Sequence, residues 1–413
     1  MSNIIKRNSI TLKDVEWVKT NKSGRPLPIE DNFIELLKTY NITIRMNDVT
    51  HKTEITGFYN CENDEKKQFN ILKDLCVKNN FITDNGRLNE MIYDIATDNN
   101  YNPFLDELRR RINKQNYVPN QTIIDEVFNC LPVNSSKTSI DFYKILFTKW
   151  CLNVVRQCEN TLSLKYSPNG VLILQGGQGA RKTTFCEKLM PNTEFVKVGH
   201  SLNPDDKDSI IQGTRTIITE LGEMDSTLKS EQARLKSFFT NSVDTYRAAY
   251  DRVQTEVPRT TTFIGTVNKS DFLKDETGNR RYWIIPLKEK VKIDIDTMEK
   301  IDMWDFWATI YYIYKNDLLE VHLKPEEEEE LNELNRDYNE ENDVSIAIDE
   351  FYDWDEKDLS KWYVRNIKEI REDIGLQYQQ KRIKNCMERK GIPYKQHKVD
   401  GRNVKGYMLP PEA

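Results

Sequence analysis

VLILQGGQGARKTTF, residues 171–185, joins four apolar residues to a turn with three glycines and then to a stretch with helical character. Four apolar residues in a row predict a strand buried on both faces, which is typical of a parallel sheet covered by helices. A glycine-rich turn between such a strand and a helix suits phosphate groups, because successive backbone N–H groups converge on phosphate oxygens. The stretch therefore predicts an α/β core built around a phosphate-binding loop.

The spacing of this turn follows most of the P-loop pattern G-x-x-x-x-G-K-[ST]. Gly176, Lys182 and Thr183 fit, whereas Arg181 stands where a glycine is expected. In this pattern the lysine adds positive charge at the phosphates and the hydroxyl binds Mg²⁺. We expect ATP and Mg²⁺ as ligands. The residues predicted to bind nucleotide are Gly176, Gly177, Gln178, Gly179, Ala180, Arg181, Lys182, Thr183 and Thr184.

Arg181 has two interpretations. If the position tolerates a negative φ, its N–H still points into the loop and its guanidinium is an additional cation for phosphate. If its Cβ does not fit, the loop is distorted and its affinity for ATP falls. We expect the first interpretation, because residues suited to nucleotide hydrolysis follow later in the chain.

Three later segments contain these residues. TIITELGEMD, residues 216–225, is a predicted strand that brings Glu220 and then Glu223 to its carboxyl end, where a carboxylate holds Mg²⁺ or aligns a water. TTFIGTVNKSDF, residues 261–272, is a strand followed by Asn268, suited to sensing a γ-phosphate. Each signal alone is commonplace, and their order along the chain gives them weight. The predicted metal ligands are Thr183 and Glu220. The third segment, DETGNRRYWIIP, places Arg280 and Arg281 before a strand. These two residues are candidate arginine fingers.

The alternation of short apolar runs with helical patterns predicts a mostly parallel sheet covered on both faces. The expected domains are an N-terminal α/β module (1–118), a helical collar (119–160), a P-loop ATPase core (161–322), an acidic helical connector (323–357) and a C-terminal winged helix (358–413). In the last segment, two helical patterns precede a hairpin that turns at Asp400-Gly401.

The C-terminal segment is basic although the whole chain has a net charge of -6. Residues 361–413 hold 13 Lys or Arg and 6 Asp or Glu, which is an electrostatic footprint for a polyanion such as DNA. A basic helix face is often only solvated, and the adjoining hairpin favours DNA binding over that interpretation. The candidate DNA contacts are Gln380, Lys381, Arg382 and Lys384 on the helix, and Lys398, Arg402 and Lys405 on the hairpin.

Four stretches in this order resemble the virulence-associated protein E family of phages and mobile genomic islands, whose members resemble superfamily 3 helicases with a AAA+ core. The stretches are LQGGQGARKTTF, TELGEMD, LKSFFTNSVDTYRAAYDRVQTEVPRTTTFIGTVN and TGNRRYW. The likeness runs from about residue 25 to about residue 330. The family usually has glycine at position 181.

The resemblance implies roles for particular residues. Lys182 and Thr183 would bind nucleotide and Mg²⁺, Glu220 or Glu223 would be the catalytic acid, and Asn268 the sensor. Arg280 or Arg281 would be a finger acting on a neighbouring subunit. A DNA-gripping hairpin of the superfamily would correspond to YRAAYDRVQTEVPR, whose candidate contacts are Arg247, Tyr250, Arg252 and Arg259.

The function expected from these features is that of an ATP-dependent DNA helicase and replication initiator. It would act as a homo-hexameric ring, with single-stranded DNA in its channel and duplex origin DNA bound by the C-terminal domain. A separate primase is expected, since no Asp-x-Asp with a matching histidine stands out in the N-terminal part. The alternative is a DNA-binding regulatory protein whose degenerate P-loop binds nucleotide without driving translocation.

Other features exclude classes of protein. No apolar run approaches the roughly 18 residues that a membrane span requires, and no secretion signal is evident, so we expect a location in the bacterial cytoplasm. Seven cysteines without a Cys-x-x-Cys pair, and four scattered histidines, argue against a disulfide framework or a zinc site.

Overall fold

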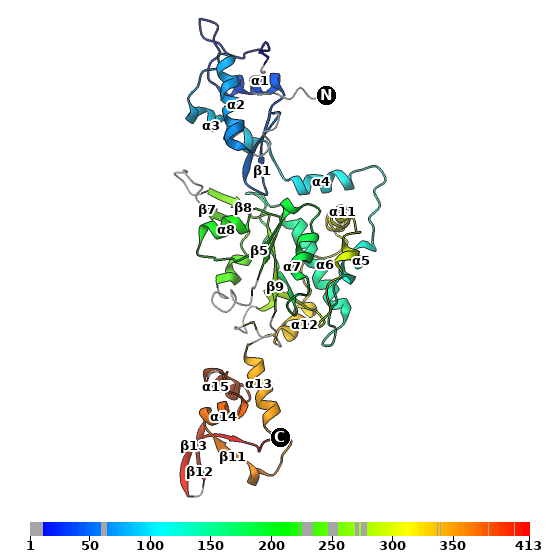
Figure 1. Cartoon of the computed structure of the whole chain (residues 1–413), viewed down its shortest axis with the longest axis vertical. Helices are drawn as coiled ribbons and strands as arrows, with labels where there is room; N and C mark the ends of the chain where they lie inside the picture. Colours follow the sequence, from blue (N-terminus) through cyan, green and yellow to red (C-terminus); the bar gives the residue numbers. More distant parts are fainter. Residues whose placement is uncertain are drawn as a thin grey trace. The chain divides into compact units, whose positions relative to one another are not determined.

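In the computed structural model the chain consists of two compact units. The first comprises residues up to Tyr117 together with Thr214–Ile217, and the second comprises Val118–Gly213 and Ile218–Ala413. Figure 1 shows the helices and strands of the chain. The structure describes residues 11–58, 64–222, 224, 234–246, 255–268, 272–273, 279–336, 338, 340–378, 380–399 and 401–413. Within these ranges, no helix combines the length and the apolar character needed to span a bilayer.

The first unit is a small α/β fold. Its three-stranded sheet has the order β2-β1-β3, with β1 antiparallel to β2 and parallel to β3. Its elements are α1 (Glu30–Tyr40), β1 (Thr43–Asn47), β2 (Lys52–Thr56), α2 (Glu65–Lys78), α3 (Asn85–Asp98), β3 (Asn100–Tyr101) and α4 (Pro103–Ile112). Asp64 and Asp84 cap α2 and α3 by accepting hydrogen bonds from backbone N–H groups of the first turn. The apolar faces of the helices bury one core that includes Phe33, Leu72 and Phe81.

The second unit is built on a five-stranded sheet in which every neighbouring pair of strands is parallel. The strand order is β10-β4-β9-β6-β5. The strands are β4 (Val171–Gln175), β5 (Val196–His200), β6 (Ile218–Leu221), β9 (Thr262–Val267) and β10 (Tyr282–Pro286). All residues of β6, β9 and β10 are buried, as expected for strands of a parallel sheet that is covered on both faces.

Helices that come before, between and after the sheet strands in the chain pack into the same body. They are α5 (Ile123–Asn129), α6 (Ile140–Gln157), α7 (Lys182–Lys188), α8 (Lys207–Gly213), α10 (Ile295–Met298), α11 (Met303–Lys315) and α12 (Pro325–Arg336), with short 3-10 turns η1 (Thr193–Phe195) and η2 (Asn279–Arg281). Trp150 on α6 is fully buried and donates to the Phe263 carbonyl on β9 at 3.0 Å. The predicted collar helix is therefore part of the core, and its tryptophan and cysteines are core residues.

A two-stranded antiparallel hairpin lies between β6 and β9 in the chain. Its strands are β7 (Val243–Tyr246) and β8 (Thr255–Pro258). This is the segment in which the sequence predicts a DNA-gripping hairpin. Arg247, Tyr250 and Arg252, which were expected to contact DNA, lie outside the described residues.

The C-terminal elements share a core of their own. They are α13 (Glu340–Phe351), η3 (Leu359–Lys361), β11 (Tyr363–Arg365), α14 (Ile367–Ile374), α15 (Gln380–Arg389), β12 (Lys395–Val399) and β13 (Arg402–Leu409), with an antiparallel sheet of order β11-β13-β12. Val344 and Ile348 of α13 pack in one cluster with Ile370, Ile383 and Tyr407. Residues 323–357, expected as a single connector, thus divide: α12 packs against β10 and η2, whereas α13 packs against α14 and α15.

Candidate functional site

The topology of the five-stranded sheet has a switch point between β4 and β9. These strands are neighbours, but the chain leaves β4 for β5 at one edge of the sheet and leaves β9 for β10 on the other side of β4. When the connections of two adjacent parallel strands run in opposite directions, a crevice is expected at the carboxyl ends of these strands, where ligands bind in open α/β sheets. The glycine-rich loop, residues 176–181, lies directly after β4 at this edge.

The loop contains two residues in the left-handed region. Gly179 has φ +82°, and Arg181 has φ +65° and ψ 28°. The expected negative φ at Arg181 is therefore wrong: the turn into α7 requires a left-handed residue, and this arginine adopts that conformation at a cost of about 1–2 kcal/mol. Gly177, Gln178 and Gly179 form the exposed top of the loop.

The Arg181 side chain reaches Asp296 of α10. Its guanidinium Nη1 lies 3.7 Å from Asp296 Oδ1, and the two side chains are 43% and 86% exposed. The loop is also fastened nearby, since the Ile293 N–H donates to the Ala180 carbonyl at 3.1 Å. An ion pair this exposed adds little stability.

Lys182 and Asn268 meet in the crevice. The Lys182 ammonium donates to the Gly176 carbonyl at 2.5 Å, to the Gly177 carbonyl at 3.0 Å and to Asn268 Oδ1 at 3.0 Å. The lysine side chain is almost entirely buried. These three acceptors are neutral oxygens, so a phosphate oxygen brought to the ammonium would offer it a stronger, charged acceptor.

Glu220, at the carboxyl end of β6, is fully buried and held from three directions. Its Oε1 accepts hydrogen bonds from the Thr183 hydroxyl at 3.2 Å and from the Thr266 hydroxyl at 2.6 Å. Its Oε2 accepts from the Gly199 N–H at 2.5 Å. Thr266 is not among the residues predicted from the sequence. Its signal is a polar residue near the carboxyl end of the strand, two positions before Asn268.

Thr183 and Glu220 suit Mg²⁺, because a carboxylate and a hydroxyl are hard oxygen ligands and the Thr183 side chain is exposed. In the part of the chain that the structure describes, no group of three or more His, Cys, Asp or Glu could hold a metal alone. Mg²⁺ commonly takes one or two protein ligands and completes its shell with phosphate oxygens and water. Glu223 lies outside the described residues.

Cys186 lies behind this site on α7. Burial raises the pKa of its thiol well above the usual range, and the negative charge of Glu220 raises it further. The thiol is therefore protonated at neutral pH and is not a nucleophile.

Arg280 and Arg281 lie on η2, the turn before β10. The Arg280 guanidinium is exposed and lies 3.8 Å from Glu328 of α12. Asn335, buried on α12, holds this turn by donating from Nδ2 to the Asn279 carbonyl at 2.8 Å and to the Tyr282 carbonyl at 2.9 Å.

Arg259 is an internal residue, which corrects the expectation that it contacts DNA. It is 1% exposed, and its Nε donates to Asp244 Oδ2 at 2.9 Å while Nη2 donates to Oδ1 of the same carboxylate. Its guanidinium also lies 4.1 Å from the Phe238 ring centroid. Because all these contacts are buried, Arg259 fastens the base of the β7–β8 hairpin and has no surface to offer a DNA backbone.

The basic residues of the C-terminal elements occupy more than one face. On α15, Gln380 and Lys384 are exposed, and the Arg382 guanidinium lies 5.9 Å from the Tyr378 ring centroid. The side chain of Lys381 is outside the description. In the β12–β13 hairpin, Lys398 pairs with Asn403, Lys405 with Gln396, and Arg402 with Val399.

Cross-strand partners share a face and successive residues alternate. Lys398 and Lys405 are therefore on the face of Tyr407, which reaches the core shared with α15. Arg402 is on the opposite face.

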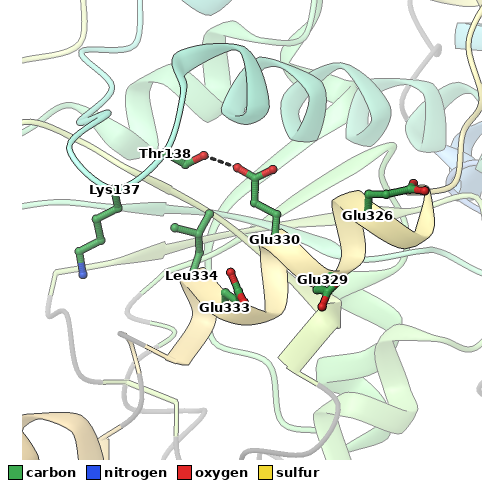
Figure 2. Close-up of a pocket in the computed structure, with 7 residues that line it drawn as sticks. All are labelled: Lys137, Thr138, Glu326, Glu329, Glu330, Glu333 and Leu334. Carbon is green, nitrogen blue, oxygen red and sulfur yellow. Dashed lines mark hydrogen bonds between the residues drawn. The ribbon is translucent and has the colours of Figure 1, made fainter.

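A pocket of about 700 Å³ lies along α12 (Figure 2). Its lining includes Glu326, Glu329, Glu330 and Glu333 of α12, and Lys137 of the loop before α6. Four carboxylates against one ammonium would repel a polyphosphate. None of the crevice residues lines this pocket.

Comparisons with known proteins identify a family. A model of the virulence-associated protein E-like domain matches residues 113–340, which include β4 to β10 and α12. No curated protein matches the sequence. Three solved structures of the NrS-1 C-terminal region align at 14% identity, covering 91–92% of this chain and 98–99% of theirs, with TM-scores of 0.43 to 0.45. A likeness at this level does not extend to function.

Proposed function

Because the chain belongs to the virulence-associated protein E-like family, we propose that it is an ATP-dependent DNA helicase and replication initiator of a phage or mobile genetic element. The observation that carries the proposal is the meeting of four side chains at one crevice of a parallel sheet. Lys182 contacts Asn268, and Thr183 contacts Glu220, all at the carboxyl ends of β4, β6 and β9. The fold that we assign to this body is a P-loop AAA+ core.

The glycine-rich loop binds the triphosphate of ATP. Lys182 exchanges the carbonyl oxygens of Gly176 and Gly177 for phosphate oxygens, and the exposed backbone of residues 177–179 surrounds the phosphates. Since an ammonium only donates, its contact with Asn268 fixes the oxygen of that amide toward Lys182. The Nδ2 donors of Asn268 are then directed elsewhere, where they orient a γ-phosphate oxygen or the attacking water.

Thr183 and Glu220 would hold Mg²⁺, and the bound ion would supply positive charge at the phosphates. The two oxygens of Glu220 already accept three hydrogen bonds, and the side chain is fully buried. These bonds leave one lone pair, on Oε2, for a metal or a water. We propose metal binding for Glu220, and either Glu220 or Glu223 as the residue that activates the water.

A finger acting in trans requires more than one copy of the chain. Arg280 or Arg281 of an adjacent copy supplies the cation at the γ-phosphate, and a closed ring, proposed as a homo-hexamer, gives every site such a neighbour. The exposure of Arg280 is compatible with this role.

Two regions contact DNA in this proposal. The segment between β7 and β8 contains Arg247, Tyr250 and Arg252, which offer cations and a ring to single-stranded DNA in the channel. The C-terminal elements act as a winged helix, in which α15 enters the major groove of origin duplex and the β12–β13 hairpin contacts its backbone. Priming is left to a separate primase.

ATP hydrolysis by the purified protein tests the proposal. We expect hydrolysis that requires Mg²⁺, is stimulated by single-stranded DNA, and falls at least about 100-fold in Lys182→Ala, the scale for removing a charge-stabilising donor from an active site. Lys188→Ala, on the same helix but paired at the surface with Glu299, is the matched control and should leave the rate unchanged.

The contrary outcome is specific. Nucleotide binding without hydrolysis, together with intact DNA binding, would replace the motor by a DNA-binding protein that uses nucleotide as an assembly signal.

A further inference from the structure

Thr266 is the side chain of the crevice that the proposed function leaves without a role. It lies on β9, two positions before Asn268, and its hydroxyl donates a hydrogen bond to Glu220 at 2.6 Å. Both Glu220 and Asn268 have a role in the proposed function. Both Thr266 and Glu220 are buried, and the bond joins two different strands of the sheet. Its hydroxyl donates to the same oxygen, Oε1, that accepts from Thr183 at 3.2 Å.

We propose that Thr266 is a positioning residue that fixes the rotation of the Glu220 carboxylate and thereby sets the affinity of the site for Mg²⁺ in the presence of nucleotide. The inference rests on the proposed function, because it assumes that Thr183 and Glu220 hold the metal. Thr266 itself touches neither metal nor nucleotide in this assignment. It acts through Glu220.

Thr183 and Thr266 both direct a hydroxyl proton at Glu220 Oε1. Thr183 can offer an oxygen lone pair to a metal only when its proton is directed elsewhere, and that proton is directed at Glu220 Oε1. The shorter bond from Thr266 holds Oε1 in place, while the Gly199 N–H holds Oε2. Without the Thr266 hydroxyl, only one donor remains on Oε1, and the carboxylate can rotate away from Thr183. Partners that orient a metal-binding group typically change metal affinity about 10–100-fold when they are removed.

The chain offers a closely matched control on the same strand. Thr262 is fully buried on β9, and its hydroxyl has no hydrogen-bond partner among the described residues. It lies four positions before Thr266, so both side chains are on the same face of the strand. Thr262→Val therefore makes the same chemical change at the same depth without removing a bond to Glu220.

The experiment compares the wild-type full chain with Thr266→Val, Thr266→Ser and Thr262→Val. Binding of a fluorescent, non-hydrolysable ATP analogue is titrated at increasing MgCl₂ and in EDTA, and the MgCl₂ requirement of ATP hydrolysis is measured in parallel. For Thr266→Val we expect the half-saturating MgCl₂ concentration to rise about tenfold, with binding in EDTA unchanged. Thr266→Ser, which keeps the hydroxyl, and Thr262→Val should stay within about twofold of the wild type.

The outcomes separate this inference from the proposed function. An unchanged MgCl₂ requirement in Thr266→Val, or an equal rise in Thr262→Val, would overturn the role of Thr266 while leaving the ATPase proposal intact. A wild type that binds no nucleotide at any MgCl₂ concentration would overturn both. If Thr266→Val does not fold, Thr266→Cys replaces it, because a thiol donates weakly; a requirement raised several-fold supports the inference, and an unchanged one overturns it.

Discussion

The glycine-rich loop and the base of the β7–β8 hairpin each contain an arginine at a position predicted to be functional. The two arginines differ in their exposure and in their contacts. Arg181 is 43% exposed in a strained left-handed conformation, with one loose ion pair. Arg259 is 1% exposed, with both edges of its guanidinium engaged by Asp244 and Phe238. An arginine in a motif indicates a charge at a position in the chain, and only the packing around it decides whether that charge meets a ligand or the core.

Removing Arg259 should have the largest effect on folding. Arg259→Met leaves Asp244 buried without its partner, and breaking a buried pair in this way typically lowers the free energy of unfolding by about 3–5 kcal/mol. Chemical denaturation would measure this loss. The double variant Arg259→Met with Asp244→Leu should recover most of it, because no uncompensated charge remains buried. A single variant as stable as the wild type would contradict the anchoring role.

Asn335 and Arg280 give a second pair of a buried and an exposed residue, at the turn η2 before β10. Asn335→Ala removes both hydrogen bonds to the carbonyls of Asn279 and Tyr282, so we expect a loss of about 2 kcal/mol in the free energy of unfolding. Arg280→Ala, at the exposed surface of the same turn, should change stability by less than about 0.5 kcal/mol. Equal losses in the two variants would show that the turn does not depend on α12.

Arg181→Gly tests the exposed member of the first pair. Glycine adopts a positive φ without strain, so we expect a gain of about 1 kcal/mol in the free energy of unfolding, as measured by chemical denaturation. ATP hydrolysis should change less than about threefold, because an exposed ion pair with Asp296 contributes little. A large increase in hydrolysis would mean that the natural arginine impairs the loop.

The β12–β13 hairpin gives the smallest expected effect. In the proposed function, the face that carries Lys398 and Lys405 contacts the backbone of duplex DNA together with α15. Replacing both lysines by alanine should then reduce the steepness of the plot of log affinity against log salt concentration by about 2, one for each lost phosphate contact. Arg402→Ala, on the other face, should leave the slope unchanged. Fluorescence anisotropy with duplex DNA at several salt concentrations measures both slopes, and the reverse result would place DNA on the Arg402 face.

Much of the core architecture could be predicted from the sequence, because it depends on local patterns. Continuous apolar runs indicated buried parallel strands, and the polar residues that end those runs indicated one edge of the sheet. The crevice does bring Lys182, Thr183, Glu220 and Asn268 together.

What the sequence did not reveal depends on packing between distant residues. The burial of Arg259 requires Asp244 and Phe238 to surround it, and arginine is otherwise an exposed residue type. The left-handed backbone of Arg181 follows from the turn and not from its residue type. The acidic run before α13 favoured the prediction of a connector, since charged stretches usually indicate solvated segments. The packing of α13 with α14 and α15 could not be inferred from that pattern.

Strand separation on a forked DNA duplex tests the central claim most directly. With ATP and Mg²⁺, the wild-type protein should release the labelled strand, whereas Lys182→Ala should bind the fork with unchanged affinity and release none. A wild-type protein that binds the fork but leaves it intact at every ATP concentration would contradict the account.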